Sequence, residues 1–72
     1  MKRAAILKKL KDQAKRAGVG FETTELTNHT GVTIGGVRST LKRHTEIDEV
    51  SAGRFFDQFA SVEGFGKGWW RS

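Results

Sequence analysis

Hydrophobic residues near the N-terminus recur every three or four positions, the spacing of an amphipathic helix. Residues 2–17 place Ile6, Leu10 and Ala14 on one stripe, with lysines and arginines on the other sides and no interrupting proline. Gly18 follows the last periodic residue and is a usual stop for a helix. The pattern therefore predicts a first helix over residues 2–17 with a basic outer face.

The next segment contains a short extended stretch at residues 21–22 and then a candidate second helix. Thr23 or Thr24 is a suitable N-cap for this helix. Gly31 is a suitable C-terminal stop, so the helix is expected to end just before it.

A third helix is expected over residues 33–44, with Thr33 as its N-cap. Val37 and Leu41 are four positions apart and would face inward together. The two adjacent glycines near its start each cost roughly 1 kcal/mol in a helix interior relative to alanine, a cost that is smaller near the first turn.

The last third of the chain is expected to start with an acidic loop over residues 46–53. Residues 54–62 fit two patterns, because Phe55, Phe59 and Val62 share a helical stripe whereas Phe56, Gln58 and Ala60 alternate as in a strand. A glycine-rich loop between two aromatic runs is typical of a hairpin, which favours the strand. Trp69 and Trp70 would then point to opposite faces, so that one is in the core and the other is exposed. The exposed tryptophan could stack on a base, pack against the first helix or form a dimer contact.

Length and composition limit the possible classes of protein. A chain of 72 residues has room for a single domain, residues 1–72. The absence of cysteine excludes disulfides, thiolate metal sites and a cysteine nucleophile. No apolar run approaches the roughly 20 residues needed to cross a bilayer, so a soluble, cytoplasmic protein is expected.

The charge pattern indicates a polyanionic partner. Thirteen Lys and Arg against eight Asp and Glu give a net charge of +5 at pH 7. Residues 1–16 hold seven Lys or Arg and one Asp, and residues 33–45 hold three Lys or Arg and no acid. Nucleic acid is favoured over an anionic membrane, because alanines are small for the apolar face of a membrane-surface helix. A basic protein without a nucleic-acid partner is the plainer alternative.

Two short helices separated by a glycine turn form a helix-turn-helix pattern. The turn would be residues 30–33, with Leu26 and Val32 buried beside it. The run of residues 30–43, TGVTIGGVRSTLKR, resembles the recognition-helix signature of bacterial winged helix-turn-helix regulators. The resemblance implies an α+β fold, a small winged helix-turn-helix with three helices and a C-terminal β-hairpin wing.

The same resemblance implies how DNA would be bound. The helix over residues 33–44 would enter the major groove and the wing over residues 63–68 would contact the backbone. Arg38 would read guanine, while Lys42 and Arg43 would meet phosphates. The predicted DNA-binding residues are Thr33, Ile34, Gly35, Arg38, Ser39, Lys42, Arg43 and Lys67.

The expected function is therefore sequence-specific binding of double-stranded DNA by a small transcriptional regulator of phage or plasmid type. It would act as a homodimer or with a partner protein. Two alternatives remain open: an architectural accessory factor for excision or replication, and a winged protein-interaction module that does not bind DNA.

Catalytic chemistry is not expected from these patterns. His29 and His44 have no cysteine or carboxylate cluster at metal-ligand spacing, so no metal or other cofactor is predicted. The glycine-rich residues 64–68 lack the spacing of a phosphate-binding loop, and Asp57 and Glu63 do not form an acid–base pair. The sequence thus predicts a protein that is not an enzyme and has no small-molecule substrate.

Overall fold

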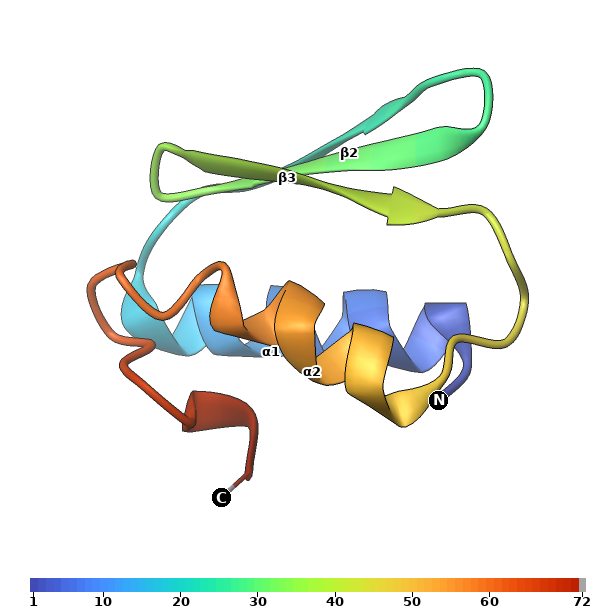
Figure 1. Ribbon diagram of the computed structural model, residues 1–72. Coiled ribbons are helices and arrows are strands. Elements are labelled where there is room, and N and C mark those ends of the chain that lie inside the picture. The colour runs from blue at the N-terminus through green and yellow to red at the C-terminus, as the bar shows by residue number, and fades with distance from the viewer. Residues whose placement is uncertain (72) are drawn as a thin grey trace.

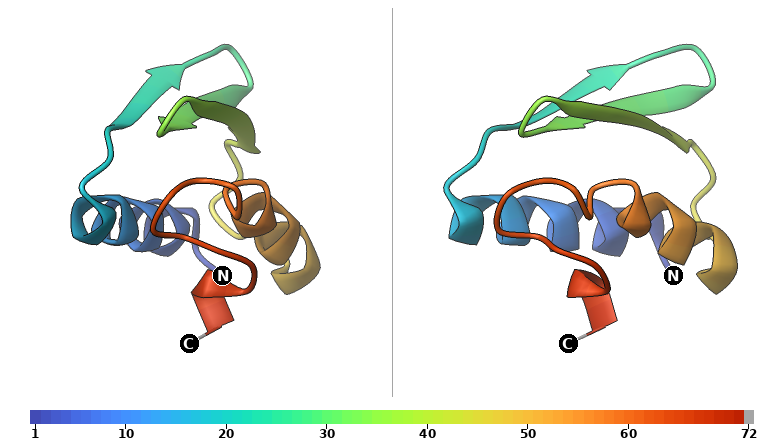
Figure 2. Two further views of the ribbon diagram at one scale, coloured as in Figure 1. Left: turned by 90° about the vertical axis from the view of Figure 1, so that its left-hand side faces the viewer. Right: turned by 60° about the vertical axis from the view of Figure 1, so that its left-hand side comes forward.

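The computed structural model describes residues 1–71 as two layers, a three-stranded antiparallel sheet and a pair of helices on one of its faces (Figure 1). The two further views in Figure 2 place both helices beneath the same face of the sheet. The elements in chain order are α1 (Arg3–Ala17), β1 (Phe21–Glu25), β2 (His29–Ile34), β3 (Val37–Lys42), α2 (Glu49–Asp57) and the short 3-10 helix η1 (Trp69–Arg71).

The predicted first helix is confirmed as α1. Ile6, Leu10 and Ala14 are buried on the stripe that faces the sheet. Gly18 ends the helix with a φ of 71°, and two cations in the last turn, Lys15 and Arg16, are well placed near the negative end of the helix dipole.

The predicted recognition helix over residues 33–44 is wrong, because this segment forms most of a β-hairpin. Gly35 and Gly36 have φ values of 54° and 85°, and they link Ile34 to its cross-strand partner Val37. A two-residue turn with positive φ at both positions matches the natural twist of antiparallel strands and is readily made by two glycines. The flanking β-branched residues favour strands over helix for the same segment.

The predicted second helix is also wrong, since Thr23 and Thr24 lie inside β1. Thr24 pairs with Gly31, the residue expected to end that helix. Leu26 is 38% exposed rather than buried and lies in the turn between β1 and β2. β-branched threonines pack well on a pleated surface, which explains why the segment is extended.

The C-terminal third is a helix followed by turns, and not the expected loop followed by a strand. Residues 46–53 were expected to be a loop, but α2 starts at Glu49, with the Asp48 carboxylate accepting a hydrogen bond from the Ser51 N–H at 3.0 Å. The strand predicted over residues 54–62 is helix as far as Asp57 and then turns. The wing predicted over residues 63–68 is likewise a series of turns.

The fold is therefore a small α+β arrangement of two α-helices and a three-stranded sheet, in the order helix, three strands, helix. It is not three helices with a C-terminal hairpin wing. The described residues contain no helix-turn-helix, because the run that resembles its signature is folded into β2 and β3.

Phe56 lies at the centre of the C-terminal aromatic packing and is fully buried. Its ring centroid is 5.3 Å from that of Trp69 and 5.6 Å from that of Trp70. The indole N–H of Trp69 donates to the Phe56 carbonyl at 3.1 Å, and that of Trp70 to the Asp57 carboxylate at 2.8 Å. Gly53 makes room for Trp70, since a Cβ there would lie 3.1 Å from the Trp70 ring. Both tryptophans pack on the core instead of alternating along a strand.

Within residues 1–71, no helix has the length and apolar character required to cross a membrane.

Candidate nucleic-acid interface

The face of the sheet turned away from α1 and α2 is here called the open face (Figures 1 and 2). Side chains alternate along a strand, and Thr30, Val32 and Ile34 of β2 are buried against the helices. Their neighbours on β2 therefore point to the open face, and the strand register extends this set to β1 and β3. The side chains of the open face are Glu22, Thr24, His29, Thr33, Arg38, Thr40 and Lys42.

His29 and Lys42 are direct cross-strand partners at one end of this face. Directly opposed side chains on antiparallel strands have Cβ atoms about 4.5–5.5 Å apart. His29 is half-buried and Lys42 is exposed, so both side chains are accessible on the same face of the hairpin.

Arg38 reaches diagonally across β2 to the middle of the open face. Its guanidinium Nη2 atom lies 3.4 Å from the position that a Cβ atom of Gly31 would occupy. Gly31 is buried under this side chain, although no helix covers it. The missing side chain at Gly31 thus leaves room for the guanidinium of Arg38 over β2.

The rest of the open face is polar. Three threonine hydroxyls lie between the charged groups, and Glu22 lies at the far end from Lys42. The open-face residues include no Phe, Tyr or Trp, so the large rings on which single-stranded bases usually stack are absent from this set. The groups present are those that bind phosphate oxygens and ribose hydroxyls.

The structure brings together three of the predicted DNA-binding residues, namely Thr33, Arg38 and Lys42, on the open face. Ile34 is fully buried and Ser39 is 9% exposed, with its hydroxyl donating to the Gln58 side-chain carbonyl. These two residues face the helices and cannot contact a ligand on the open face.

The other predicted contacts lie elsewhere. Gly35 is in the hairpin turn, and Arg43 follows β3 and pairs with Glu25. Lys67 is in the turn before η1 and borders a hollow with Asp57 and Arg71, in the helical layer. The geometry that the resemblance implied for these residues therefore does not occur.

A polar cluster joins the ends of the strands to α1. The Thr30 hydroxyl accepts a hydrogen bond from Arg3 and donates one to Glu25 Oε1 at 2.9 Å. Arg3 and Arg43 also form ion pairs with Glu25. The hydrogen bond from Thr30, together with the nearby charges of Arg43 and Arg3, lowers the pKa of Glu25 below its ordinary value.

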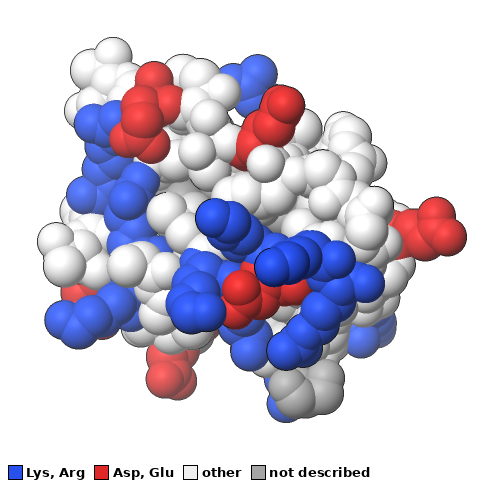
Figure 3. All heavy atoms as spheres, turned by 180° about the vertical axis from the view of Figure 1, so that it is seen from behind, with Lys and Arg blue, Asp and Glu red and all other residues white. Residues whose placement is uncertain are grey.

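A second basic surface lies on the opposite layer. Figure 3 shows Lys and Arg side chains gathered over the α1 side of the molecule, with carboxylates among them. Lys8 pairs with Asp12 at 2.9 Å, while Lys11, Lys15 and Arg16 are exposed. This surface is built from one helix face and has no histidine among its residues.

Sequence reasoning did not select His29, Thr24 or Thr40. The signal that could have found His29 and Thr40 is the spacing of two between Val32 and Ile34 and the even spacing of Val37 and Leu41, on either side of two glycines. Thr24 lies outside these runs. No group of three or more potential metal ligands occurs among residues 1–71.

Comparisons with family models, with curated proteins and with solved structures give no match for this chain. We therefore infer the function from the residues of the open face themselves.

Proposed function

We propose that the chain binds single-stranded RNA on the open face and cleaves its backbone there, with His29 as the general base. The observation that carries this proposal is the direct pairing of His29 with Lys42, on the face where the guanidinium of Arg38 lies over Gly31. Histidine is the side chain most often used for general acid–base catalysis, and cations beside it can stabilise a developing negative charge.

The reaction is an internal transesterification. His29 accepts the proton of a ribose 2′-hydroxyl as its oxygen attacks the adjacent phosphorus. A new O2′–P bond forms, the P–O5′ bond breaks, and the leaving 5′-oxygen takes a proton from water. The products are a 2′,3′-cyclic phosphate and a 5′-hydroxyl, and the proton on His29 returns to solvent.

Lys42 and Arg38 have complementary parts in this step. Lys42 is a compact charge next to the imidazole, whereas the planar Arg38 guanidinium can hold two phosphate oxygens at once. Both would stabilise the extra negative charge that the phosphate gains in the transition state. The hydroxyls of Thr24, Thr33 and Thr40 would hold neighbouring phosphates and riboses.

The composition of the surface predicts contacts with the sugar–phosphate backbone. A sheet face without Phe, Tyr or Trp offers mainly charged and hydroxyl groups, which bind the backbone and predict weak dependence on sequence. The chemistry needs a 2′-hydroxyl, which RNA has and DNA lacks. An RNA substrate also accords with the cytoplasmic location expected from the sequence. This proposal replaces the expectation of a non-catalytic protein, which considered the histidines only as metal ligands.

The test is a single-turnover cleavage assay with a 5′-labelled, mixed-sequence RNA of 12 nucleotides. We expect His29→Ala to lower the cleavage rate by at least about 100-fold while RNA affinity stays within about twofold. His44→Ala is the matched control, because His44 is exposed and lies beyond the end of β3. Cleavage by His29→Ala at the wild-type rate would refute the role of His29. If the wild-type protein binds RNA without cleaving it, the proposed catalysis is refuted and only the RNA-binding role stands.

Duplex DNA is a second candidate ligand, favoured by a different observation. Thr33, Arg38 and Lys42 lie on β2 and β3 of the three-stranded sheet, and some DNA-binding proteins read the major groove with strands. Arg38 would read guanine from β3 instead of from a helix. A second copy of the chain would supply a second half-site, as a regulator or an architectural protein requires.

Anisotropy titrations with single-stranded RNA and duplex DNA of equal length separate the two candidates. The RNA proposal predicts tighter binding of RNA at every salt concentration. Tighter binding of duplex DNA, with a sequence preference that Arg38→Ala removes, would favour the DNA reading instead.

A further inference from the structure

The outer edge of β3 has backbone groups that are not used by the sheet. The strand order is β1-β2-β3, so β3 pairs on one side only. Alternate residues of an antiparallel strand direct their N–H and C=O groups to opposite sides. In a hairpin with a two-residue turn, Ile34 and Val37 bond to each other, and the Arg43 N–H donates to the Asn28 carbonyl. The backbone groups of Arg38, Thr40 and Lys42 therefore point outward.

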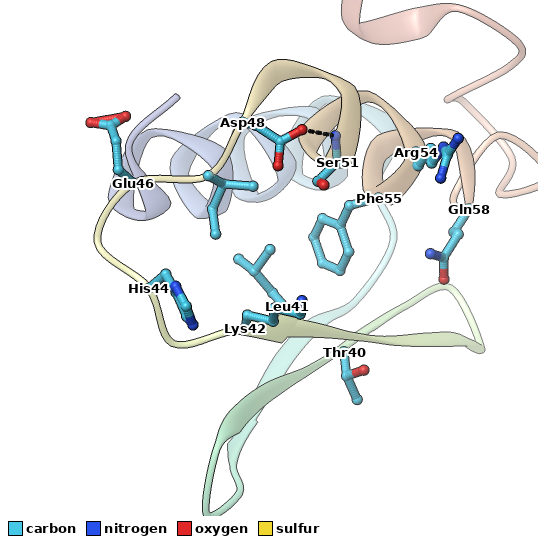
Figure 4. A pocket seen from close by; sticks show the side chains of 11 residues that line it. Thr40, Leu41, Lys42, His44, Glu46, Asp48, Ser51, Arg54, Phe55 and Gln58 are labelled. Atoms are coloured by element: carbon cyan, nitrogen blue, oxygen red, sulfur yellow. Dashed lines mark hydrogen bonds between the residues drawn. The ribbon is translucent and has the colours of Figure 1, made fainter.

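A hollow of about 330 Å³ runs beside this edge, between β3 and α2. Figure 4 shows Leu41 and Phe55 pointing into it, and Thr40 pointing away to the other face of the sheet. Ile47 also lines the hollow, and these three apolar side chains are 4–7% exposed. A strand added to the β3 edge would have alternate side chains over this apolar floor.

The charges on the open face indicate which residues a strand added beside β3 would present on that face. Arg38 and Lys42 are exposed on β3 at alternate positions of the open face. Opposite charges on adjacent strands stabilise a sheet, and like charges directly opposed destabilise it. The β1 edge has the reverse sign, because its charged residues are Glu22 and Glu25. An acidic strand would thus select β3 over β1.

A second copy of the chain is a poor occupant of this edge. Antiparallel self-pairing centred on Thr40 would place Arg38 of one copy opposite Lys42 of the other, two like charges. Pairing of β1 with β3 of another copy would place only one acidic residue, Glu22, near Arg38 and Lys42. Glu25 is already paired with Thr30 and two arginines of its own copy. Such head-to-tail pairing would also leave an unpaired strand edge at each end of the assembly.

We propose that the β3 edge is a docking site for an extended segment of a partner protein in which acidic and apolar residues alternate. The segment adds a fourth strand to the sheet, with its apolar residues over Leu41, Ile47 and Phe55. Its acidic residues lie beside Arg38 and Lys42. This surface is tested without nucleic acid, so its failure would not bear on the RNA proposal.

The probe is a capped, labelled peptide of alternating glutamate and valine, six residues long, titrated against the full chain. We expect saturable binding, slowed amide hydrogen exchange at Arg38, Thr40 and Lys42, and at least tenfold weaker binding of the matching lysine–valine peptide. Thr40→Pro removes one outward N–H from an edge strand and should weaken binding at least tenfold, whereas Thr40→Ala should not.

A second variant tests the same surface in case Thr40→Pro does not fold. The double change Arg38→Glu and Lys42→Glu should bind the lysine–valine peptide in preference to the glutamate–valine peptide. The proposal is overturned if the acidic peptide does not bind at millimolar concentration, or if slowed exchange maps to β1. A dimer in sedimentation that persists on dilution and excludes the peptide would assign the edge to a second copy instead.

Discussion

His29 and Lys42 are directly opposed across β2 and β3, and this pairing is set by the hairpin turn at Gly35 and Gly36. A shift of one residue in the register would turn His29 toward the helices and bring a buried residue such as Thr30 to the open face. The geometry of the proposed site therefore depends on two glycines at the other end of the hairpin.

The two turn glycines should differ in how well they tolerate alanine. Both have positive φ, which costs an L-residue roughly 1–2 kcal/mol. A Cβ atom at Gly35 would also lie 2.8 Å from Val62 Cγ1, whereas nothing lies within 4 Å at Gly36. Urea denaturation should show a larger loss of stability for Gly35→Ala than for Gly36→Ala. Equal losses would mean that Val62 does not constrain the turn.

The salt dependence of RNA binding should identify which basic surface holds the phosphates. Each phosphate contact on a single strand contributes about 0.7 to the slope of log affinity against log salt concentration. Lys42→Gln should therefore reduce the magnitude of the slope by about 0.7. Lys15→Gln, an equally exposed change on α1, should leave it unchanged. The reverse result would place the RNA on α1.

Phe56 should be the most sensitive aromatic position for stability. It is fully buried and contacts both tryptophan rings. Truncation of a buried phenylalanine to alanine costs about 3–5 kcal/mol, and we expect that loss for Phe56→Ala in chemical denaturation. Val50→Ala is the control, since Val50 is 66% exposed and should change stability by no more than about 0.5 kcal/mol.

Glu25 should make stability depend on pH in the acid range. Its folded pKa is lowered from 4.5, first by the hydrogen bond from Thr30 and then by Arg43 and Arg3. A lowered folded pKa means that charged Glu25 stabilises the fold above pH 4.5, and that this contribution is lost as the pH falls through the folded pKa. Thermal melts should show Glu25→Gln to be less stable than wild type at pH 7, with the difference shrinking below pH 4.5.

Glu63→Gln is the control for this experiment, because Glu63 is exposed and outside the cluster of Thr30 and the two arginines. A gap between wild type and Glu25→Gln that stays constant from pH 7 to pH 3 would contradict the assignment.

The first helix could be predicted from the sequence, because Leu7 and Ala17 add spacings of three to the stripe of Ile6, Leu10 and Ala14, and a strand with a period of two does not give such spacings. The hairpin was missed because Val37 and Leu41 are four apart, a spacing that satisfies both the helical period and the strand period of two. The adjacent glycines were the deciding signal, since they are costly in a helix and favoured in a two-residue turn.

The site was harder to predict than the fold. Arg38 and Lys42 could be chosen as nucleic-acid contacts, Arg38 for guanine and Lys42 for phosphate, but the pairing of His29 with Lys42 follows only from the strand register. Ser39 and Ile34 were misplaced for the same reason, because a helix and a strand expose different residues of one segment. Phe56 belongs to the alternating pattern and not to the helical stripe, yet it is buried by the tryptophans that follow far along the chain.

The most direct test of the central claim is cleavage of a DNA strand that contains one ribonucleotide. The account predicts a single cut, on the 3′ side of that ribonucleotide, that leaves a 2′,3′-cyclic phosphate and a 5′-hydroxyl, and no cut in the all-deoxy strand. Mass spectrometry of the products would identify these ends. Cleavage of the all-deoxy strand, or binding of an all-RNA strand without any cleavage, would contradict a reaction in which His29 activates the 2′-hydroxyl.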